Sequence, residues 1–218
     1  KIVYSFEEDG RLKSVLDVTL QGADNVEVIF RDVMKTKDDE LAGITGGGEF
    51  KVVANLPYYI TTPLVMRFIE SSLPVNSLTV MVQKEVADRL CAECGSADYA
   101  AVTLAVRMFG DAKITRTVDR RNFRPVPNVD SAVVHITRVS DRMNGADGAL
   151  VKRLVRAAFA MRRKTLANNL SASFGMPKDK ASALITSCGF SADVRGERLS
   201  LDDFIALSRA VKQDFHAI

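Results

Sequence analysis

Short runs of apolar and β-branched residues alternate, along the first two thirds of the chain, with segments whose apolar residues recur every three or four positions. The short runs are typical of strands, and the longer spacing is typical of amphipathic helices. The pattern predicts strands at 2–6, 26–29, 51–54, 77–82, 112–118 and 131–137, with helices at 11–20, 63–71, 84–93 and 99–108. This alternation favours an α/β domain with a mostly parallel sheet, helices on both faces and an antiparallel pair at one edge.

The strand pattern ends near residue 139. Residues 140–148 are polar and contain two glycines and two aspartates, which is typical of a linker. Helical spacing then recurs at 150–160, 165–173, 178–187 and 201–212. We therefore predict an α/β domain over residues 1–139, a linker over 140–148 and a small all-α domain over 149–218.

Composition sets broad limits on the class of protein. The chain has 218 residues, of which 47% are hydrophobic, and it contains no apolar stretch of the about 18 residues that a membrane span needs. Its three cysteines are too few for a disulfide framework, which favours the reducing cytoplasm. Cys91 and Cys94 form a C-x-x-C, but there is no second pair, so we expect a helical surface pair and no metal site.

The charge is distributed unevenly along the chain. Residues 1–50 carry 6 Lys/Arg and 11 Asp/Glu, residues 51–140 carry 11 and 8, and residues 141–218 carry 13 and 8. The overall net charge of +3 therefore conceals a basic C-terminal two thirds. Such a surface favours a polyanionic partner, although an ordinary solvated surface gives the same pattern.

The most specific chemical signal is the end of the apolar run that precedes Asn55-Leu56-Pro57-Tyr58. A strand that ends in a side-chain amide, a rigid proline and an aromatic ring presents a hydrogen-bond acceptor, an exposed carbonyl and a flat apolar face at one edge. This combination suits the amino group of a planar base such as adenine. Alternatively, Asn55 is a turn former and Tyr58 a core aromatic.

Two other strand ends carry carboxylates. Glu7 follows the first predicted strand and Asp32 follows the second. In open α/β sheets, ligands bind at the carboxyl ends of strands. These carboxylates are therefore candidates to accept hydrogen bonds from a ribose and an adenine amine, although acidic residues at strand ends also serve as helix caps.

Asn55-Leu56-Pro57-Tyr58 resembles the Asn/Asp-Pro-Pro-aromatic motif of S-adenosylmethionine-dependent amino methyltransferases. The variant with Leu, continuing through Pro63, resembles the ribosomal RNA adenine dimethyltransferases, in the branch that modifies the small subunit rather than the antibiotic-resistance branch. Further similar blocks are Glu7–Leu12, Gln83–Leu90, Phe123–Val133, Arg162–Leu170 and Arg198–Ser200.

The resemblance implies a Rossmann-like methyltransferase sheet followed by a small all-α domain, and S-adenosylmethionine as the cofactor. It implies dimethylation of the exocyclic amine of adjacent adenosines in small-subunit ribosomal RNA, with a role in ribosome biogenesis. By this resemblance the catalytic residues are Asn55, Leu56, Pro57 and Tyr58, and the cofactor contacts are Glu7, Asp32, Val33 and Asn55.

The expected RNA contacts come from two further places. Tyr58 and Phe123 are expected to stack on the two faces of the target base, although Phe123 also suits a core. Two basic clusters are candidates for the RNA backbone: Arg120, Arg121 and Arg124, and Arg162, Arg163 and Lys164. The expected partner is small-subunit RNA or the immature small subunit, bound by a cytoplasmic monomer.

One part of the family pattern has no counterpart in the sequence. The glycine-rich loop that follows the first strand of the family would precede Lys1, so the expectation is a chain without that strand and loop. Such a chain is expected to bind S-adenosylmethionine poorly and to be inactive. Two other functions stay open: a ribosome-assembly or nucleic-acid-binding factor without essential methylation, and a DNA-adenine methyltransferase.

Overall fold

The computed structural model describes residues 1–55 and 57–216, with side chains as far as Lys212. Its first part is a two-stranded parallel sheet of β1 (Val3–Glu7) and β2 (Val26–Phe30), with Glu7 opposite Phe30. The 3-10 turn η1 (Gly10–Leu12) and helix α1 (Lys13–Thr19) connect the two strands. None of these elements contains a buried residue, so this N-terminal layer has no core of its own.

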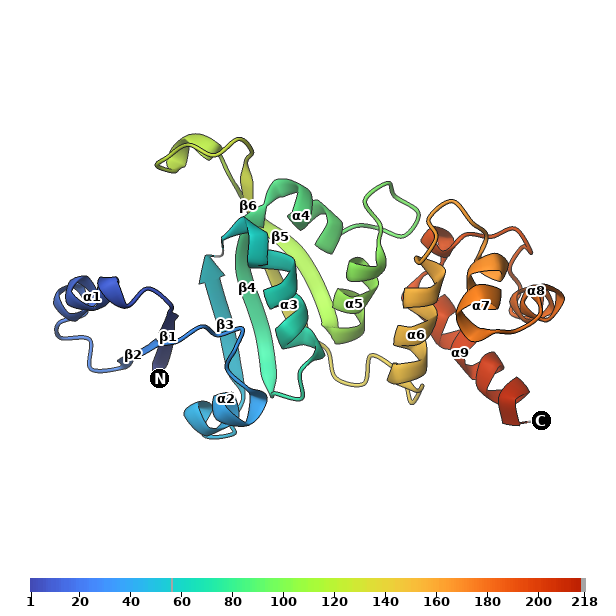
Figure 1. Cartoon of the computed structure of the whole chain (residues 1–218), viewed down its shortest axis with the longest axis horizontal. Coiled ribbons are helices and arrows are strands. Elements are labelled where there is room, and N and C mark those ends of the chain that lie inside the picture. Colours follow the sequence, from blue (N-terminus) through green and yellow to red (C-terminus); the bar gives the residue numbers. More distant parts are fainter. Residues whose placement is uncertain (56, 217–218) are drawn as a thin grey trace.

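The second sheet has four strands in the order β3-β4-β6-β5 (Figure 1). They are β3 (Phe50–Asn55), β4 (Val75–Gln83), β6 (Ser131–Arg138) and β5 (Gly110–Val118). Only β3 and β4 pair in parallel, and the other two pairings are antiparallel. The prediction of one mostly parallel sheet is therefore wrong in two respects. The described strands form two separate sheets, and antiparallel pairing predominates in the larger one.

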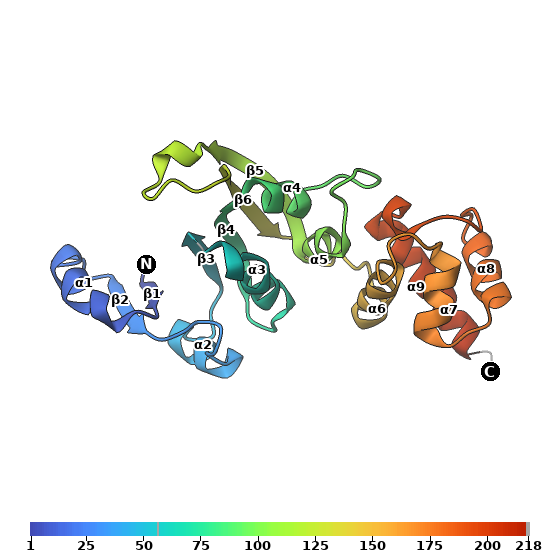
Figure 2. The same ribbon diagram turned by 45° about the horizontal axis from the view of Figure 1, so that its top comes forward.

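Helices cover one face of the four-stranded sheet (Figure 2). They are α3 (Thr61–Glu70), α4 (Lys84–Leu90) and α5 (Ala101–Phe109). Alternate residues of β4 and β6, such as Val80 and Val134, are fully buried, while their neighbours are half-buried. This alternation is typical of a sheet with one covered face. The prediction of helices on both faces is therefore not met in the described part of the chain.

Two connections shape the functional end of the sheet. Helix α2 (Asp38–Thr45) lies between β2 and β3 and was not predicted. Residues 119–130, between β5 and β6, form a finger that projects beyond the sheet and contains the 3-10 turn η3 (Arg120–Asn122) (Figure 1). Both connections adjoin the strand ends at which the candidate site residues lie.

The C-terminal part is helical, as predicted. It consists of α6 (Gly148–Ala158), α7 (Leu166–Phe174), α8 (Lys178–Ser187), the 3-10 turn η4 (Gly196–Arg198) and α9 (Leu201–His216). Its apolar core includes Tyr99 and Leu104 from the preceding part of the chain. The Tyr99 hydroxyl donates a hydrogen bond to the Leu199 carbonyl at 2.9 Å, and burial raises the pKa of Tyr99. The helical part is therefore joined to α5 by a shared core.

In the described residues, no helix is long and apolar enough to cross a membrane.

Candidate active site

The predicted motif Asn55–Tyr58, called the acceptor motif because its groups would accept hydrogen bonds from an adenine amine, starts where β3 ends. Asn55 is the last residue of β3 and is exposed, opposite Met81 of the parallel strand β4. Leu56 lies outside the described residues, so its predicted catalytic carbonyl is not placed. Pro57 is exposed and precedes the 3-10 turn η2 (Tyr58–Ile60), which leads directly into α3. The described residues of the motif thus lie between the end of β3 and the start of α3.

The geometry of this connection is held by its own hydrogen bonds. The Pro57 carbonyl accepts from the backbone N–H of Ile60 at 3.1 Å and from the Thr61 hydroxyl at 3.3 Å. Thr61 is fully buried, so the start of α3 is fixed against the core. Because the pyrrolidine ring fixes φ, which is −56° here, Pro57 also has little backbone freedom. The backbone from Pro57 to Thr61, which follows the motif's asparagine, is therefore rigid.

Tyr58 is held from a distant strand. Its phenolic oxygen lies 2.9 Å from the hydroxyl oxygen of Ser131, the first residue of β6. Ser131 is fully buried, whereas the ring of Tyr58 is half-buried. We did not predict a role for Ser131, although it belongs to the block from Phe123 to Val133 in which the sequence resembles the family.

Phe123, the residue predicted to stack on the target base opposite Tyr58, makes no ring contact with Tyr58 in the described part of the chain. Phe123 is half-buried within the finger. Stacking of a base by Phe123 stays a prediction.

The predicted cofactor residues lie at the carboxyl end of the parallel pair β1–β2. Glu7 ends β1, and one of its carboxylate oxygens accepts the backbone N–H of Asp9 at 2.8 Å. Asp32 follows β2 by two residues. Both carboxylates therefore lie at one edge of the N-terminal layer, as expected for parallel strands.

Asp32 is held as an anion in its loop. Its Oδ1 accepts the backbone N–H of Met34 at 2.8 Å, and Lys35 Nζ lies 3.2 Å from its other oxygen. The hydrogen bond from Met34 is the main cause that lowers the pKa of Asp32. The adjacent Val33 is half-buried and packs against the core of the four-stranded sheet. The loop thus offers a carboxylate beside an apolar surface.

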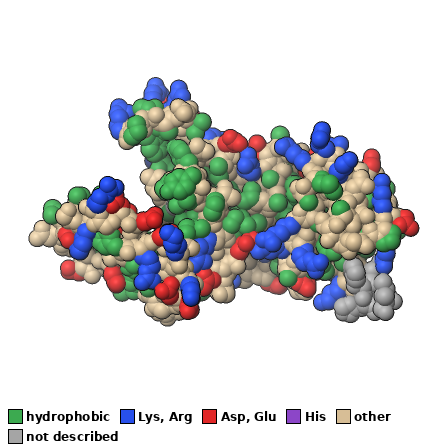
Figure 3. All heavy atoms as spheres, viewed as in Figure 1, with side chains coloured by type: hydrophobic (Ala, Val, Ile, Leu, Met, Phe, Trp, Pro, Cys, Tyr) green, Lys and Arg blue, Asp and Glu red, His purple; other side chains and the backbone are tan. Residues whose placement is uncertain are grey.

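The two predicted basic clusters are exposed. Arg120, Arg121 and Arg124 lie on the finger, and Arg162, Arg163 and Lys164 lie between α6 and α7. Lys and Arg side chains gather over the finger and over the helical part, on the same side of the molecule (Figure 3). The second cluster has no ion pair in the described structure. Its charges are therefore available to a polyanion.

The finger itself is ordered by side-chain contacts. Arg121 forms a 2.7 Å ion pair with Asp119, and this hydrogen-bonded guanidinium lowers the pKa of Asp119 to about 2. Asp130 accepts the backbone N–H of Arg120 at 2.9 Å, and Arg124 donates to two finger carbonyls. The basic residues of the finger therefore have defined positions even though they are exposed.

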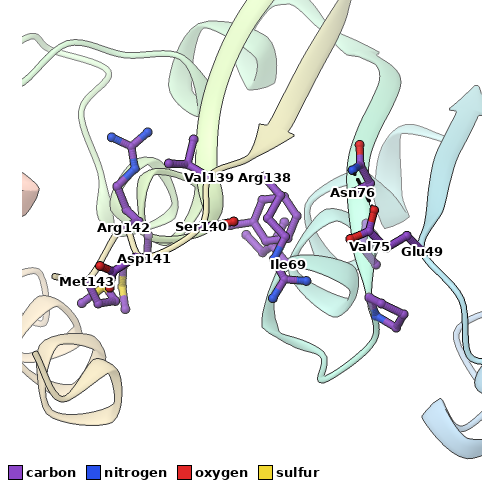
Figure 4. Close-up of a pocket in the computed structure, with 13 residues that line it drawn as sticks. Glu49, Ile69, Val75, Asn76, Arg138, Val139, Ser140, Asp141, Arg142 and Met143 are labelled. Carbon is purple, nitrogen blue, oxygen red and sulfur yellow. Dashed lines mark hydrogen bonds between the residues drawn. The ribbon is translucent and has the colours of Figure 1, made fainter. Parts of the chain in front are cut away.

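A separate cavity of about 640 Å³ lies at the opposite end of β3 (Figure 4). It is lined by Glu49 and Val75 next to the starts of β3 and β4, by Arg138 at the end of β6, and by linker residues as far as Met143. Asn55 lies at the other end of β3. This cavity is therefore not part of the candidate active site.

Comparison with known proteins gives a match over most of the chain. The family model "Ribosomal RNA adenine dimethylase" matches residues 1–212. The chain is 42% identical, over 217 residues, to "Ribosomal RNA small subunit methyltransferase A" of Bacillus mycoides (strain KBAB4) and of Bacillus cereus (strain B4264). Each match covers 97% of this chain and 74% of the relative.

Two solved structures share the fold. A dimethyladenosine transferase from Plasmodium falciparum has a TM-score of 0.82 at 24% identity, covering 98% of this chain and 83% of that one. The 23S rRNA methyltransferase ErmE has a TM-score of 0.74 at 23% identity, covering 97% and 82%. The strand-end motif, the carboxylates at the carboxyl ends of β1 and β2, and the match over residues 1–212 lead to one conclusion: the chain belongs to the ribosomal RNA adenine dimethylase family.

Proposed function

We propose that this protein transfers methyl groups from S-adenosylmethionine to the exocyclic amine of adjacent adenosines in small-subunit ribosomal RNA, forming dimethyladenosine. The observation that carries the proposal is that the exposed Asn55 ends β3 and the half-buried Tyr58 begins the 3-10 turn that precedes α3. The relatives of 42% identity are small-subunit RNA methyltransferases by name, which supports this substrate class.

The residues after β1 and β2 suit the nucleoside part of the cofactor. A ribose presents two hydroxyl donors, and the carboxylate of Glu7 is an acceptor at the end of β1. An adenine presents an amine donor and an apolar face, which Asp32 and Val33 match with a carboxylate and a packed side chain. S-adenosylmethionine, when bound, supplies an electrophilic methyl group on a sulfonium. We assign Glu7 to the ribose and Asp32 with Val33 to the adenine.

The acceptor side prepares the nitrogen that receives the methyl group. The amine of adenine is a poor nucleophile because its lone pair is delocalised into the ring. The side-chain oxygen of Asn55 and the carbonyl of Leu56 accept hydrogen bonds from the amine. These bonds favour a pyramidal nitrogen whose lone pair points outward. The rigid turn at Pro57 keeps these acceptors aimed, and positioning of this kind contributes much of the acceleration in such reactions.

Aromatic side chains hold the target base. Tyr58 stacks on one face, and its hydrogen bond to Ser131 keeps the ring in place. Phe123, on the finger, closes the other face. Stacking of a base on an aromatic ring contributes roughly 1–3 kcal/mol. Since the amine must reach Asn55, the adenosine is turned out from its neighbours before it reacts.

The basic clusters bind the RNA backbone on either side of this site. Arg120, Arg121 and Arg124 contact phosphates from the finger, and Arg162, Arg163 and Lys164 contact them from the helical domain. Residues 1–139 act as the catalytic domain, 140–148 as the linker and 149–218 as the RNA-binding or ribosome-binding domain. The protein works as a cytoplasmic monomer on the immature small subunit.

The test uses the full-length protein, S-adenosylmethionine and small ribosomal subunits that lack the modification. Mass spectrometry of the recovered RNA is expected to show dimethyladenosine at two adjacent positions. Tight binding to the subunits without any methylated product would overturn the proposal and favour a ribosome-assembly factor. Methylation of duplex DNA in place of RNA would also overturn it.

A further inference from the structure

Arg67 is a charged residue within the apolar helix α3. Its side chain is only 16% exposed, and its neighbours Val65 and Phe68 are core residues. A guanidinium that is removed from water to this extent needs hydrogen-bond partners. Its partners do not lie on α3. They lie 29 to 34 positions earlier in the sequence.

All three hydrogen-bond partners of Arg67 lie between the end of β2 and the first residue of α2. Nη1 donates to the carboxylate of Asp38 at 2.7 Å, Nη2 donates to the carbonyl of Thr36, and Nε lies 3.5 Å from the carbonyl of Val33. This is the segment that carries Asp32 and Val33, to which we assign the adenine of the cofactor. The guanidinium therefore touches the backbone of the proposed adenine-binding loop.

These contacts occupy a special place in the fold. In the described part of the chain, the side-chain hydrogen bonds that join residues 1–45 to the four-stranded sheet and its helices all come from Arg67. The two sheets share no strand pairing. Apolar contacts of the same segment, including those of Val33 and the buried Leu41, add to this connection but have no comparable directionality. Arg67 thus gives a directional contact between the loop at residues 33–38 and helix α3.

The loop has its own hydrogen bonds, but these determine only its shape. Asp32 accepts from the backbone of Met34, and the hydroxyl of Thr36 donates to the Asp32 carbonyl at 3.0 Å. Such local bonds do not place the loop relative to β3. The planar fork of an arginine can hold several acceptors at once in fixed directions, which a lysine cannot do.

Helix α3 begins at Thr61, directly after the 3-10 turn that follows Pro57, and Arg67 lies less than two turns later. We propose that Arg67 is a positioning residue. It fixes the position of the proposed adenine-binding loop, residues 32–38, relative to the acceptor motif at Asn55–Tyr58. The inference rests on the proposed function, because it assigns the loop to the cofactor. Its assigned role is indirect: Arg67 acts through the carbonyls of Val33 and Thr36 and the carboxylate of Asp38.

The test compares variants of the full-length protein. Arg67→Ala is expected to raise the Kd for S-adenosylmethionine and for S-adenosylhomocysteine about tenfold, as loss of charged hydrogen bonds predicts. Calorimetry measures both constants. The KM for the cofactor is expected to rise in parallel, while kcat at saturating cofactor and the Kd for RNA change by less than about twofold. Arg67→Lys is expected to recover only part of the affinity.

Two further variants separate this role from general stability. Asp38→Asn weakens the same ion pair from the more exposed side and is expected to raise the cofactor Kd in the same direction as Arg67→Ala. Arg107→Ala is the matched control. Arg107 also donates to a carbonyl (Ala92) and a carboxylate (Glu93), but both lie away from the cofactor loop. It is expected to leave the cofactor Kd unchanged. Hydrogen exchange at residues 32–38 is expected to accelerate in Arg67→Ala and Asp38→Asn but not in the control.

The outcomes distinguish the inference from the proposed function. If the wild-type protein binds the cofactor and Arg67→Ala and Asp38→Asn bind it equally well, the positioning role is wrong and the proposed function stands. If Arg107→Ala weakens cofactor binding as much as Arg67→Ala, the effect is general destabilisation, and the role is again wrong. If the wild-type protein neither binds the cofactor nor methylates RNA, the proposed function fails, and the assignment of Arg67 to that cofactor fails with it.

Discussion

The phenolic oxygen of Tyr58 and the hydroxyl oxygen of Ser131 lie 2.9 Å apart, although 73 positions separate the two residues in the sequence. This hydrogen bond joins the turn after β3 to the first residue of β6, which is not adjacent to β3 in the sheet. Ser131 is fully buried, so its position is determined by the sheet. The aromatic ring of the acceptor motif is therefore placed by a strand other than its own.

We expect Ser131→Ala to slow methylation several-fold without changing the affinity for cofactor. Removing the hydroxyl leaves the half-buried Tyr58 without its partner, and such a loss costs about 1 kcal/mol of stability. Single-turnover kinetics with saturating RNA measure the rate, and urea unfolding measures the stability. Tyr58→Phe removes the same hydrogen bond while retaining the ring, so the double variant is expected to be no slower than either single variant. If the losses of rate in the two single variants add up in the double variant, the two hydroxyls act independently and their hydrogen bond is not the cause.

Asn55→Ala is expected to reduce methylation to a small residual rate and to leave RNA binding nearly unchanged. The amide oxygen is the acceptor that the proposed mechanism needs, and loss of one aimed polar group of this kind lowers kcat by about 10²- to 10³-fold. Because Asn55 is exposed at the end of β3, the substitution leaves no cavity in the core. Mass spectrometry of RNA after prolonged incubation measures the residual product. Wild-type turnover by this variant would contradict the assignment of the motif.

The elements that the sequence predicts well are those whose signals are local. The apolar run before Asn55 predicts β3 almost to the residue, since the structure has Phe50–Asn55 where 51–54 was expected. Pro177 precedes α8, and the helix spans Lys178–Ser187 as predicted. Strand ends are also local, which is why Glu7 and Asp32 were found at one edge of a parallel pair.

What the sequence does not predict depends on contacts between distant residues. Helix α2 has Leu41 as its one buried residue, so its apolar pattern is too weak to recognise. Arg67 reads as an interruption of an apolar helix face, and only the structure shows that its partners lie on the loop at 33–38. A lone cation in an otherwise apolar helix was the available signal.

The two basic clusters are expected to contribute to RNA affinity through their charge. Replacing Arg120, Arg121 and Arg124 together by Ala, or Arg162, Arg163 and Lys164 together by Ala, should weaken binding at low salt. The plot of log K against log salt has a negative slope, and each lost phosphate contact is expected to make it shallower by up to about 0.9. Filter binding over a range of salt concentrations measures the slope. Replacing three exposed lysines elsewhere (Lys13, Lys178 and Lys212) is the control, and an equal loss in this control would show that the clusters act only through net charge.

Glu70 connects the helix of the acceptor site to the helical domain. It ends α3, and its carboxylate lies 2.6 Å from Lys152 Nζ and 3.7 Å from an Nη of Arg156, both on α6. Since α3 begins beside the acceptor turn, this ion pair relates the acceptor site to the basic cluster at 162–164. All three side chains are at least 30% exposed, so charge reversal at Glu70 should change stability by about 1 kcal/mol or less. A substrate that engages both domains should be more sensitive to their relative position.

Glu70→Lys is therefore expected to lower kcat/KM for intact small subunits several-fold more than for a short RNA hairpin that reaches only the catalytic domain. The charge-exchanged double variant Glu70→Lys with Lys152→Glu restores an attractive pair, and it should recover most of the lost activity on subunits. Parallel steady-state assays on the two substrates measure the ratio. An equal loss on both substrates would place the effect inside the catalytic domain. Failure of the exchanged pair to recover activity would show that the contact with Lys152 does not determine the domain arrangement.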